Sequence, residues 1–433
     1  MKIAFISQPS DIVSTHGQCC SVPIWTYAVA CRLAKSCEVT VLSRRGVEQP
    51  IEWYEGVHYR RFPRMTDLRG LCGLRYRALQ CWSTLGAVMG KPLNTRRALT
   101  AFESMLYCLS YSVLAAIHVR RHRYDIVHVM NFTQVAHIIR AFNPRIKIVL
   151  HMHCAWLHLL DSRKIAARLR HTDLILGCSE YVSNLTRKRF PQYAQRCWTL
   201  SNGVDIEHFR PAGETDTGPP AQHRLLFVGR VSPEKGVHVL IEAFARVQEH
   251  FPDAHLDIVG PTIGQLPYDL LVSLEDDEYV QRLSRFYDRS GECTYMDHLH
   301  HAASRLGRPN RITFHGLLPY QDLVRFYQDA SVCIVPSIMH EPFGMPVIEA
   351  MACGVPVVAS RCGGITTVVE HEHTGLLVER DDPKELAAAI CRFLENEEQC
   401  ISMGQAGRER ARKHFSWETI SDQLLEKYAL MLQ

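Results

Sequence analysis

Several common sequence patterns are missing from this chain of 433 residues, and each absence disfavours a class of protein. Its 16 cysteines include no Cys-x-x-Cys pair, which disfavours zinc-binding and thioredoxin-like sites. No Gly-x-Gly-x-x-Gly follows the first predicted strand, which disfavours a Rossmann dehydrogenase. The longest apolar run, at 105–119, is interrupted by polar residues and is too short to span a bilayer comfortably. We interpret it as a buried helix.

The N-terminus shows no secretory signal pattern. Its residues MKIAFISQPS have no charged region followed by an apolar core, and they predict a first strand instead. The thiols are then most simply reduced and often buried, and the adjacent pair Cys19-Cys20 is better explained by packing than by redox chemistry. We therefore expect a cytoplasmic protein.

The chain has an ordinary globular composition but an uneven charge distribution. Hydrophobic residues make up 46% and charged residues 22%. From Met1 to Asp205 there are 28 Lys and Arg against 12 Asp and Glu, and the remainder has 21 against 33. The basic first part predicts an anionic partner, either a membrane surface or an acidic acceptor, although solvated surface charge would give the same counts. We expect no nucleic-acid partner.

Residues 57–97 mix arginines with Leu, Trp, Met and Phe. An interfacial amphipathic helix that docks on a membrane has this composition. A helical surface that binds an anionic acceptor, or a core helix with solvated arginines, would have it too. The sequence leaves these alternatives open, and they include peripheral attachment at the cytoplasmic face of a membrane.

Short apolar runs alternate with helical-length segments, which predicts two doubly wound α/β domains. We expect a first domain over 1–205, a second over 206–415 that begins with a Pro-, Gly- and Thr-rich linker, and a final helix over 416–433. Residues 262–310, which include the acidic run EDDE, predict an inserted helical excursion. The predicted buried strands lie at 2–7, 38–43, 125–130, 147–153, 174–179, 224–230, 255–260, 311–316, 331–337 and 355–360.

The segment 340–360, HEPFGMPVIEAMACGVPVVAS, is the most informative part of the chain. Pro346 suits the first turn of a helix, and Gly344 lets the preceding backbone approach a ligand closely. The free N–H groups at that helix start form an anion site. Glu349 lies about one turn inside the helix, where it can accept hydrogen bonds from ribose hydroxyls, and Glu341 lies in the entry loop, where a sugar would sit. This order of groups suits a nucleotide-diphosphate sugar, although a buried helix with two surface carboxylates would show the same spacing.

A second motif, VGRVSPEKG at 228–236, places two cations at a strand-to-helix turn. Arg230 follows the strand end, and Lys235 comes five residues later at the start of a helix. A guanidinium binds two oxygens at once and an ammonium acts as a point charge, so this pair suits a diphosphate. Alone, the two residues could equally be exposed surface cations. Together with the downstream glutamates they predict a diphosphate site.

Both motifs resemble those of glycosyltransferase family 4, the retaining nucleotide-sugar enzymes of the GT-B fold. The shared features are two glutamates separated by seven residues, the Phe-Gly between them, the following AMACGVPVVAS, the CGG at 362–364 and the NGVD at 202–205. The resemblance implies two Rossmann-like domains that face each other across a cleft, with the last helix returning to the first domain. It implies transfer of a hexosyl-type sugar from a nucleotide diphosphate, with UDP favoured, to a glycan, lipid-linked or small-molecule acceptor, as in polysaccharide biosynthesis.

The resemblance also assigns roles to individual residues. Glu341 and His153 would be the catalytic residues, with Glu341 positioning the donor rather than acting as a clear covalent nucleophile. The family implies front-face attack, in which the leaving phosphate accepts the proton of the acceptor. The residues expected to bind the donor are Gly17, Arg230, Lys235, Leu318, Glu341, Phe343, Gly344, Met345, Pro346, Val347 and Glu349.

Three of the matched positions depart from the family or admit a second interpretation. The family usually has two adjacent glycines after the first strand, whereas here only Gly17 is present. Of the two histidines in HMHC, His153 matches the family position near the donor sugar, and His151 is expected to point to the opposite face in a structural role. Ser179 matches a frequent family serine but could equally cap the next helix.

No Asp-x-Asp motif is present, of the kind with which metal-dependent glycosyltransferases hold a divalent ion. Arg230, Lys235 and the helix N-terminus are expected to neutralise the leaving group instead, so we predict no metal and no other cofactor. The HLHH at 298–301 lacks partner carboxylates at a set spacing and is not predicted to bind metal. Two other functions stay open. A nucleotide-sugar epimerase would turn over without an acceptor, and a non-catalytic nucleotide-sugar-binding module would not turn over at all.

Overall fold

The computed structural model describes residues 1–15, 20–63, 103–105, 109–213, 223–287, 293–306 and 309–433. The chain divides into two compact units. Unit 1 combines Met1–Leu200 with Ile420–Gln433, and unit 2 comprises Ser201–Thr419. The sequence placed the first boundary after residue 205 and the start of the final helix at 416, a few residues from these divisions.

Unit 1 contains a sheet whose strands follow the order β3-β4-β2-β1-β5-β6-β7-β8. Neighbouring strands are parallel except β3 and β4, which form an antiparallel hairpin. The strands are β1 (Lys2–Ile6), β2 (Glu38–Arg44), β3 (Ile51–Tyr54), β4 (Val57–Phe62), β5 (Ile126–Met130), β6 (Lys147–Met152), β7 (Leu174–Gly177) and β8 (Cys197–Thr199). The helices are α1 (Ser21–Leu33), α4 (Leu109–His122), α5 (Thr133–Phe142), α6 (Ser162–Leu169) and α7 (Glu180–Arg189), with short 3-10 turns η2 (Trp156–His158) and η3 (Pro191–Arg196).

Unit 2 contains a parallel sheet of order β11-β10-β9-β12-β13-β14. From β9 the chain adds β10 and β11 on one side, and it then adds β12, β13 and β14 on the other side, so the strand order reverses between β9 and β12. The strands are β9 (Arg224–Val228), β10 (His255–Val259), β11 (Ile312–Gly316), β12 (Val332–Val335), β13 (Val357–Ser360) and β14 (Gly375–Val378). The helices are α8 (Val237–His250), α9 (Tyr268–Leu274), α10 (Glu278–Arg282), α11 (Tyr295–Ser304), α12 (Leu323–Asp329), α13 (Met345–Ala352), α14 (Ile365–Val368), α15 (Pro383–Glu395) and α16 (Glu397–Phe415). Short 3-10 turns are η4 (Pro233–Lys235), η5 (Leu283–Phe286), η6 (Pro309–Arg311) and η7 (Tyr320–Asp322).

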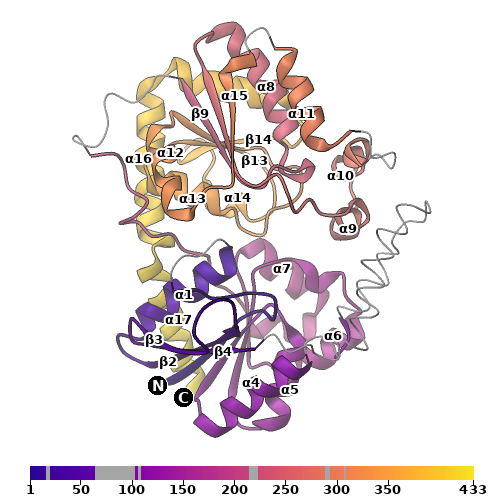
Figure 1. The fold of residues 1–433 in the computed structure, drawn as a ribbon, viewed down its shortest axis with the longest axis vertical. Helices are drawn as coiled ribbons and strands as arrows, with labels where there is room; N and C mark the ends of the chain where they lie inside the picture. Colours follow the sequence, from indigo (N-terminus) through magenta and orange to yellow (C-terminus); the bar gives the residue numbers. More distant parts are fainter. Residues whose placement is uncertain (16–19, 64–102, 106–108, 214–222, 288–292, 307–308) are drawn as a thin grey trace. The chain divides into compact units, whose positions relative to one another are not determined.

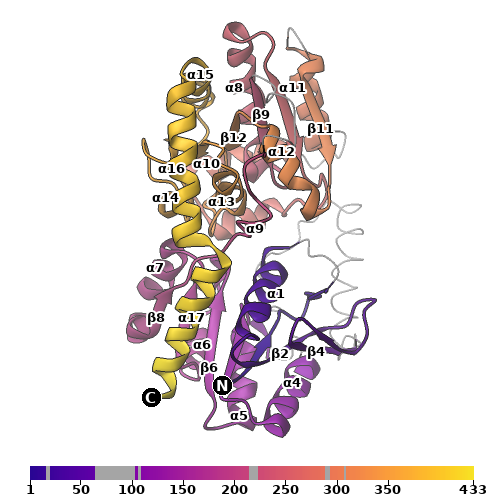
Figure 2. The ribbon, with the colours of Figure 1, turned by 90° about the vertical axis from the view of Figure 1, so that its left-hand side faces the viewer.

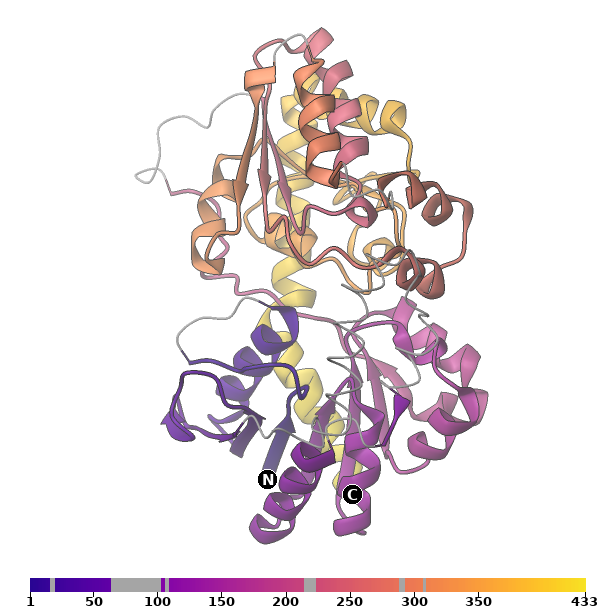
Figure 3. The same ribbon diagram turned by 45° about the vertical axis from the view of Figure 1, so that its right-hand side comes forward.

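Helices cover both faces of the unit 2 sheet. α8 packs against α11 and α15, whereas α13 packs against α16 (Figures 1 and 3). Buried apolar side chains of α8, α11 and α15 join those of the strands in one core, which includes Phe244 and Phe393. Burial of such large side chains is the main term that stabilises the sheet and its helices.

The last helix, α17 (Trp417–Leu432), begins in unit 2 and ends in unit 1 (Figure 2). Ile420, Leu424 and Tyr428 recur every four residues and are fully buried, as one face of a helix requires. The hydroxyl of Tyr428 lies 2.5 Å from Nδ1 of His128 on β5, which fixes the end of the helix on unit 1. The predicted return of the last helix to the first domain is therefore confirmed.

Every strand predicted from the sequence is present, with ends that shift by one or two residues. The sequence missed β3, β4, β8 and β14. β3 and β4 meet at Glu55 and Gly56, which have φ angles of 47° and 74°, the positive values that a two-residue hairpin turn uses. The helical interpretation of 57–97 is therefore wrong for Val57–Phe62, which form β4, and its remainder from 64 lies outside the described residues.

Two other expectations concern helices. The apolar run at 105–119 contributes most of α4, whose residues Ala115, Ala116 and Val119 are fully buried. The described residues of 262–310 form a helical excursion between β10 and β11, as predicted, and Leu271, Val280 and Leu299 anchor it in the core. Among the helices that the structure describes, none combines the length and apolar character needed to cross a bilayer.

Candidate functional site

The two sequence motifs meet at one edge of the unit 2 sheet. Arg230 follows the carboxyl end of β9, and Glu341 lies in the loop that follows β12. These neighbouring strands flank the point where the strand order of the sheet reverses. In open parallel sheets, ligands bind outside the carboxyl ends of the strands at such a switch point. The topology therefore brings together residues that are more than a hundred positions apart.

The turn between β9 and α8 depends on Gly236. Its φ of 72° lies in the left-handed region, and a Cβ there would lie 1.9 Å from the carbonyl oxygen of Pro336. Amides of Ile338 and Met339 donate to the Glu234 carbonyl, at 2.9 and 3.3 Å. The turn that carries Lys235 and the loop that carries Glu341 are thus tied to each other through the backbone.

A buried carboxylate orients Arg230. Its Nη2 donates to Oε1 of Glu234 at 2.7 Å, and its Nε donates to Oγ of Ser232 at 3.3 Å. Ser232 in turn donates to the same carboxylate oxygen at 2.7 Å. The Arg230 side chain is about a third exposed, so these contacts orient it while leaving part of it accessible. Sequence reasoning missed Glu234 and Ser232, although both lie inside the VGRVSPEKG motif.

Lys235 and Glu341 form an ion pair. The Lys235 Nζ lies 2.5 Å from Glu341 Oε1, and Ser337 donates to the same oxygen at 2.6 Å. Burial raises the pKa of Glu341, but the Lys235 ammonium and the Ser337 hydrogen bond together lower it by a larger amount. The pKa therefore lies below its usual value. Glu341 is therefore an ionised carboxylate that already has a cationic partner.

The glutamate motif forms the start of α13. Gly344 precedes the helix with a φ of 103°, a conformation that favours glycine, and Pro346 lies in the first turn as predicted. Phe343 and Val347 are buried at 3% and 0% exposure, and the Val347 amide already donates to the Gly344 carbonyl at 3.1 Å, so Val347 offers a ligand neither its side chain nor its N–H. Met345 is half-buried at the helix start. The amides of this turn and the positive end of the helix dipole favour an anion.

Glu349 lies inside α13 and is only 3% exposed. The hydroxyl of Tyr327 donates to its Oε2 at 2.8 Å. Burial raises the pKa of Glu349 to about 7, and hydrogen bonding lowers it only partly. The carboxyl is therefore close to half protonated at neutral pH, a property that the sequence did not indicate. Tyr327 was also missed, because nothing in the sequence pairs α12 with α13.

The remaining predicted donor residues differ in how the structure describes them. Leu318 is half-buried in the loop between β11 and η7, close in sequence to the end of β11 in unit 2. Gly17 lies outside the described residues.

In unit 1, His153 directly follows β6, and its amide donates to Oδ1 of Asn131 at 2.7 Å. Its ring centroid lies 4.0 Å from that of His151 and 5.5 Å from that of Trp25. The prediction that His151 points to the opposite face is therefore wrong. Residues two apart along a strand share a face, and both histidines pack around the same indole.

His151 belongs to a buried polar chain. Its Nδ1 lies 3.2 Å from Nε2 of His128. The other ring nitrogen of His128, Nδ1, is hydrogen-bonded to the Tyr428 hydroxyl. Burial holds the pKa values of His128 and His151 well below the usual value, so both rings are neutral. Ser179 accepts a hydrogen bond from the Val182 amide at 3.3 Å and caps α7, which supports its structural alternative.

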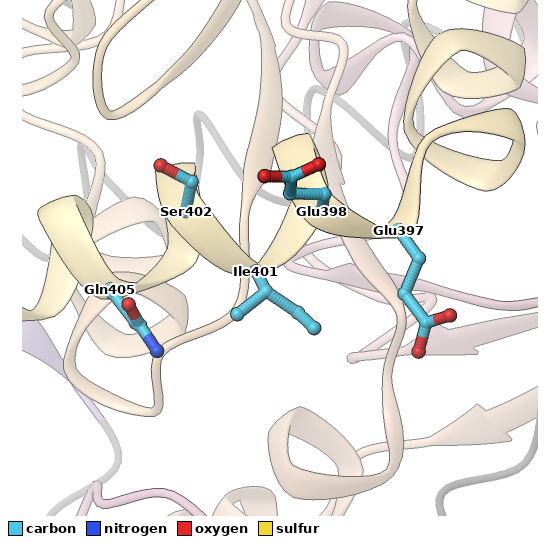
Figure 4. A pocket seen from close by; sticks show the side chains of 5 residues that line it. All are labelled: Glu397, Glu398, Ile401, Ser402 and Gln405. Carbon is cyan, nitrogen blue, oxygen red and sulfur yellow. The ribbon is translucent and has the colours of Figure 1, made fainter.

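Within the described ranges, no three His, Cys, Asp or Glu side chains gather in an arrangement that could hold a metal ion. The histidines of HLHH lie on α11, where His298 packs on Phe286 and His300 on Phe314. A hollow of about 420 Å³ lies along exposed residues of α16 and includes none of the motif residues (Figure 4). Its lining consists of Glu397, Glu398, Ile401, Ser402 and Gln405.

Two family profiles match most of the chain. The profile for glycosyl transferases group 1 matches residues 216–410, and that for Glycosyltransferase Family 4 matches residues 94–208. Spore coat protein SA of Bacillus subtilis is 24% identical over 336 residues, covering 73% of this chain and 81% of that protein. The D-inositol 3-phosphate glycosyltransferase of Corynebacterium urealyticum is 31% identical over 281 residues, covering 62% of this chain and 59% of that protein.

Solved structures share the fold across the whole chain. Sucrose-phosphate synthase from Thermosynechococcus elongatus has a TM-score of 0.67 at 21% identity, covering 100% of this chain and 99% of that one. Anabaena HepE in complex with UDP has a TM-score of 0.66 at 21% identity, covering 99% and 100%. With two Rossmann-like sheets and both family profiles in evidence, this chain belongs to the family 4 glycosyltransferases of the GT-B fold.

Proposed function

We propose that this glycosyltransferase moves a hexosyl-type sugar from a nucleotide-diphosphate donor to a glycan, lipid-linked or small-molecule acceptor, with retention of anomeric configuration. The observation that carries this proposal is the Lys235–Glu341 ion pair at the switch point of unit 2. It joins the cationic motif to the glutamate motif, so that the proposed diphosphate site and the proposed sugar site would lie side by side.

The donor would lie across the carboxyl edge of the unit 2 sheet. Arg230, Lys235 and the start of α13 would bind the diphosphate, because together they offer a fork of N–H donors, a point charge and free backbone amides. Glu349 would accept hydrogen bonds from the ribose hydroxyls, and the backbone at Leu318 would contact the base. Glu341 would bind hydroxyls of the sugar beside the diphosphate. Met345 and Pro346 would contribute the backbone of the helix start.

In the proposed reaction, the bond from the anomeric carbon to the donor phosphate breaks while a bond from an acceptor oxygen forms on the same face. The acceptor hydroxyl loses its proton to the leaving phosphate oxygen. Arg230 and Lys235 would stabilise the charge that develops on the departing diphosphate. Glu341 and His153 would position the reacting groups. This route needs neither a covalent glycosyl-enzyme nor a divalent metal.

The choice of UDP as donor draws support from relatives. Anabaena HepE, which shares the fold, has been solved with UDP-glucose, at a TM-score of 0.66 and 20% identity. The D-inositol 3-phosphate glycosyltransferases among the relatives suggest that a phosphorylated small molecule belongs among the acceptors to be tested. We also propose a cytoplasmic protein that attaches to anionic membranes through its basic N-terminal region, which would suit a role in polysaccharide biosynthesis.

A thermal-shift screen of UDP-, GDP- and ADP-sugars tests the donor site, since a ligand that binds the native state raises its stability. We expect one nucleotide-sugar class to stabilise the wild-type protein, and Arg230→Ala to lose that shift while keeping a native circular dichroism spectrum. If no nucleotide-sugar stabilises the wild type, the proposal fails. Conversion of the bound donor to an isomer without acceptor would indicate an epimerase instead.

A further inference from the structure

The inserted segment 262–310 touches the loop that carries Glu341. We propose that Glu275, on this insertion, is a positioning residue for the donor sugar, because it holds the backbone from which Glu341 projects. The inference deepens the proposed function and rests on it. It gives the insertion a role at the reaction site, which neither its helical pattern nor its acidic run predicted.

Glu275 binds the residue that precedes Glu341. Its Oε2 accepts a hydrogen bond from the His340 amide at 2.8 Å, and its Oε1 lies 3.4 Å from Nε2 of the same histidine. Glu275 lies between α9 and α10, and its side chain is 12% exposed. A carboxylate that accepts a backbone N–H is a strong hydrogen-bond acceptor, and burial strengthens the interaction further.

Arg380 completes the support. Its Nη1 donates to Glu275 and to the carbonyl of Ile338, the latter at 3.0 Å. Its Nη2 donates to Asp277 at 2.6 Å, and its guanidinium lies 4.4 Å from the ring centroid of Tyr279. The guanidinium thus joins two carboxylates of the insertion to the loop after β12. One cation satisfies both carboxylates, so Glu275 is not left as an uncompensated buried charge.

Gly363 and Gly364, the glycine pair that follows β13, hydrogen-bond to the opposite side of the loop. The Gly363 amide donates to Nδ1 of His340 at 2.8 Å, and the Gly364 amide donates to the Glu341 carbonyl at 2.7 Å. Because Nδ1 accepts, the His340 ring carries its proton on Nε2, the nitrogen that faces Glu275. The backbone at residues 340–341 is therefore fixed between the insertion and the glycine pair.

This geometry determines what loss of Glu275 should change. Glu341 is the proposed sugar ligand, whereas Arg230 and Lys235 are the proposed diphosphate ligands. A looser loop would misplace Glu341 and weaken its pairing with Lys235, which would leave the ammonium at least as available to a free nucleoside diphosphate. A residue that merely stabilises unit 2 would instead affect both kinds of ligand together.

The test compares Glu275→Ala with Glu278→Ala in the full chain. Glu278 is a matched control, because it lies on the same insertion and its described partner is Arg282 rather than the loop. Calorimetry would measure affinity for UDP and UDP-glucose, and for GDP and GDP-mannose. Glu275→Ala should weaken binding of the accepted nucleotide-sugar about ten-fold, as expected for the loss of a charged hydrogen bond. Affinity for the matching nucleoside diphosphate should stay within about two-fold or tighten, and Glu278→Ala should change neither.

Glu275→Gln covers the case in which the alanine variant does not fold. It keeps an acceptor for the His340 amide but loses the charge that faces Arg380, so it should show the same selective loss to a smaller degree. The positioning role would be overturned if the Glu275 variants weakened binding of the nucleotide-sugar and of the nucleoside diphosphate equally, or if neither Glu275→Ala nor Glu275→Gln changed either affinity. Both outcomes would leave the proposed function intact. If the wild type binds neither nucleotide-sugar, the proposed function is overturned, and this inference with it.

Discussion

Replacing Lys235 by Met should damage stability and donor binding together. The ammonium lies 2.5 Å from Glu341, and the two side chains are 25% and 13% exposed. Removing one member of a buried pair costs about 3–5 kcal/mol, and removing an ordinary charged hydrogen bond costs about 1.5–3 kcal/mol. Because water reaches Lys235 and Ser337 still donates to Glu341, we expect a loss of about 2 kcal/mol in the free energy of unfolding. In a unit of this size, that lowers the melting temperature by about 4–8 °C.

The pH dependence and a double variant make this prediction specific. The folded-state pKa of Glu341 is lowered, so the pair contributes stability above the unfolded pKa of a glutamate and loses it as pH falls. The difference in the free energy of unfolding between wild type and Lys235→Met should therefore become smaller towards acid pH. Adding Glu341→Gln to Lys235→Met removes the unpaired charge and should recover part of the stability at neutral pH.

The assay is thermal unfolding across pH, together with calorimetric titration of the nucleotide-sugar. Lys384→Met, at an exposed position of α15, is the matched control and should behave as wild type. If Lys235→Met is as stable as this control and binds the donor as tightly as wild type, then the ion pair neither supports the site nor contacts the diphosphate.

Three further predictions follow from the structure and the sequence. Folded Glu349 has a pKa raised to about 7, so wild type should lose up to about 3 kcal/mol of stability relative to Glu349→Gln as pH rises from about 5 to 8. Melting temperatures of the two proteins that change with pH in the same way would contradict this. Sugar transfer should survive EDTA, and activity restored only by magnesium or manganese would refute metal independence. Binding to anionic vesicles should fall steeply with salt, and replacing Arg69, Arg75 and Arg77 by Gln should reduce it without changing nucleotide affinity; protein that stays in the supernatant at low salt would rule out membrane docking.

The sequence predicted what depends on local patterns. Apolar runs located the buried parallel strands, because such strands are covered on both faces. The hairpin of β3 and β4 was missed, because half-buried residues alternate with exposed ones along β3 and with buried ones at the start of β4, so neither strand is a long apolar run. The start of α13 was predicted correctly from Gly344 and Pro346, since both residues act through their own backbone.

Contacts between distant segments could not be predicted in this way. Glu275 and Arg380 are 105 positions apart, and nothing local marks either as a partner of His340. The raised pKa of Glu349 depends on the burial of α13 and on Tyr327 of α12, which only the folded chain brings together. The placement of His151 beside His153 did follow from strand periodicity, and the opposite expectation misapplied that rule.

The most direct test of the proposed function is to measure transfer itself. The nucleotide-sugar that stabilises the protein would be incubated with glycans, lipid-linked sugars and phosphorylated polyols, and the products followed by mass spectrometry and NMR. We expect one acceptor to gain a hexose and nucleoside diphosphate to be released in equal amount. The proposed function also requires that the new bond keep the anomeric configuration of the donor and that Glu341→Gln abolish the transfer. An inverted product, or a bound donor that is isomerised or left unchanged with every acceptor, would contradict it.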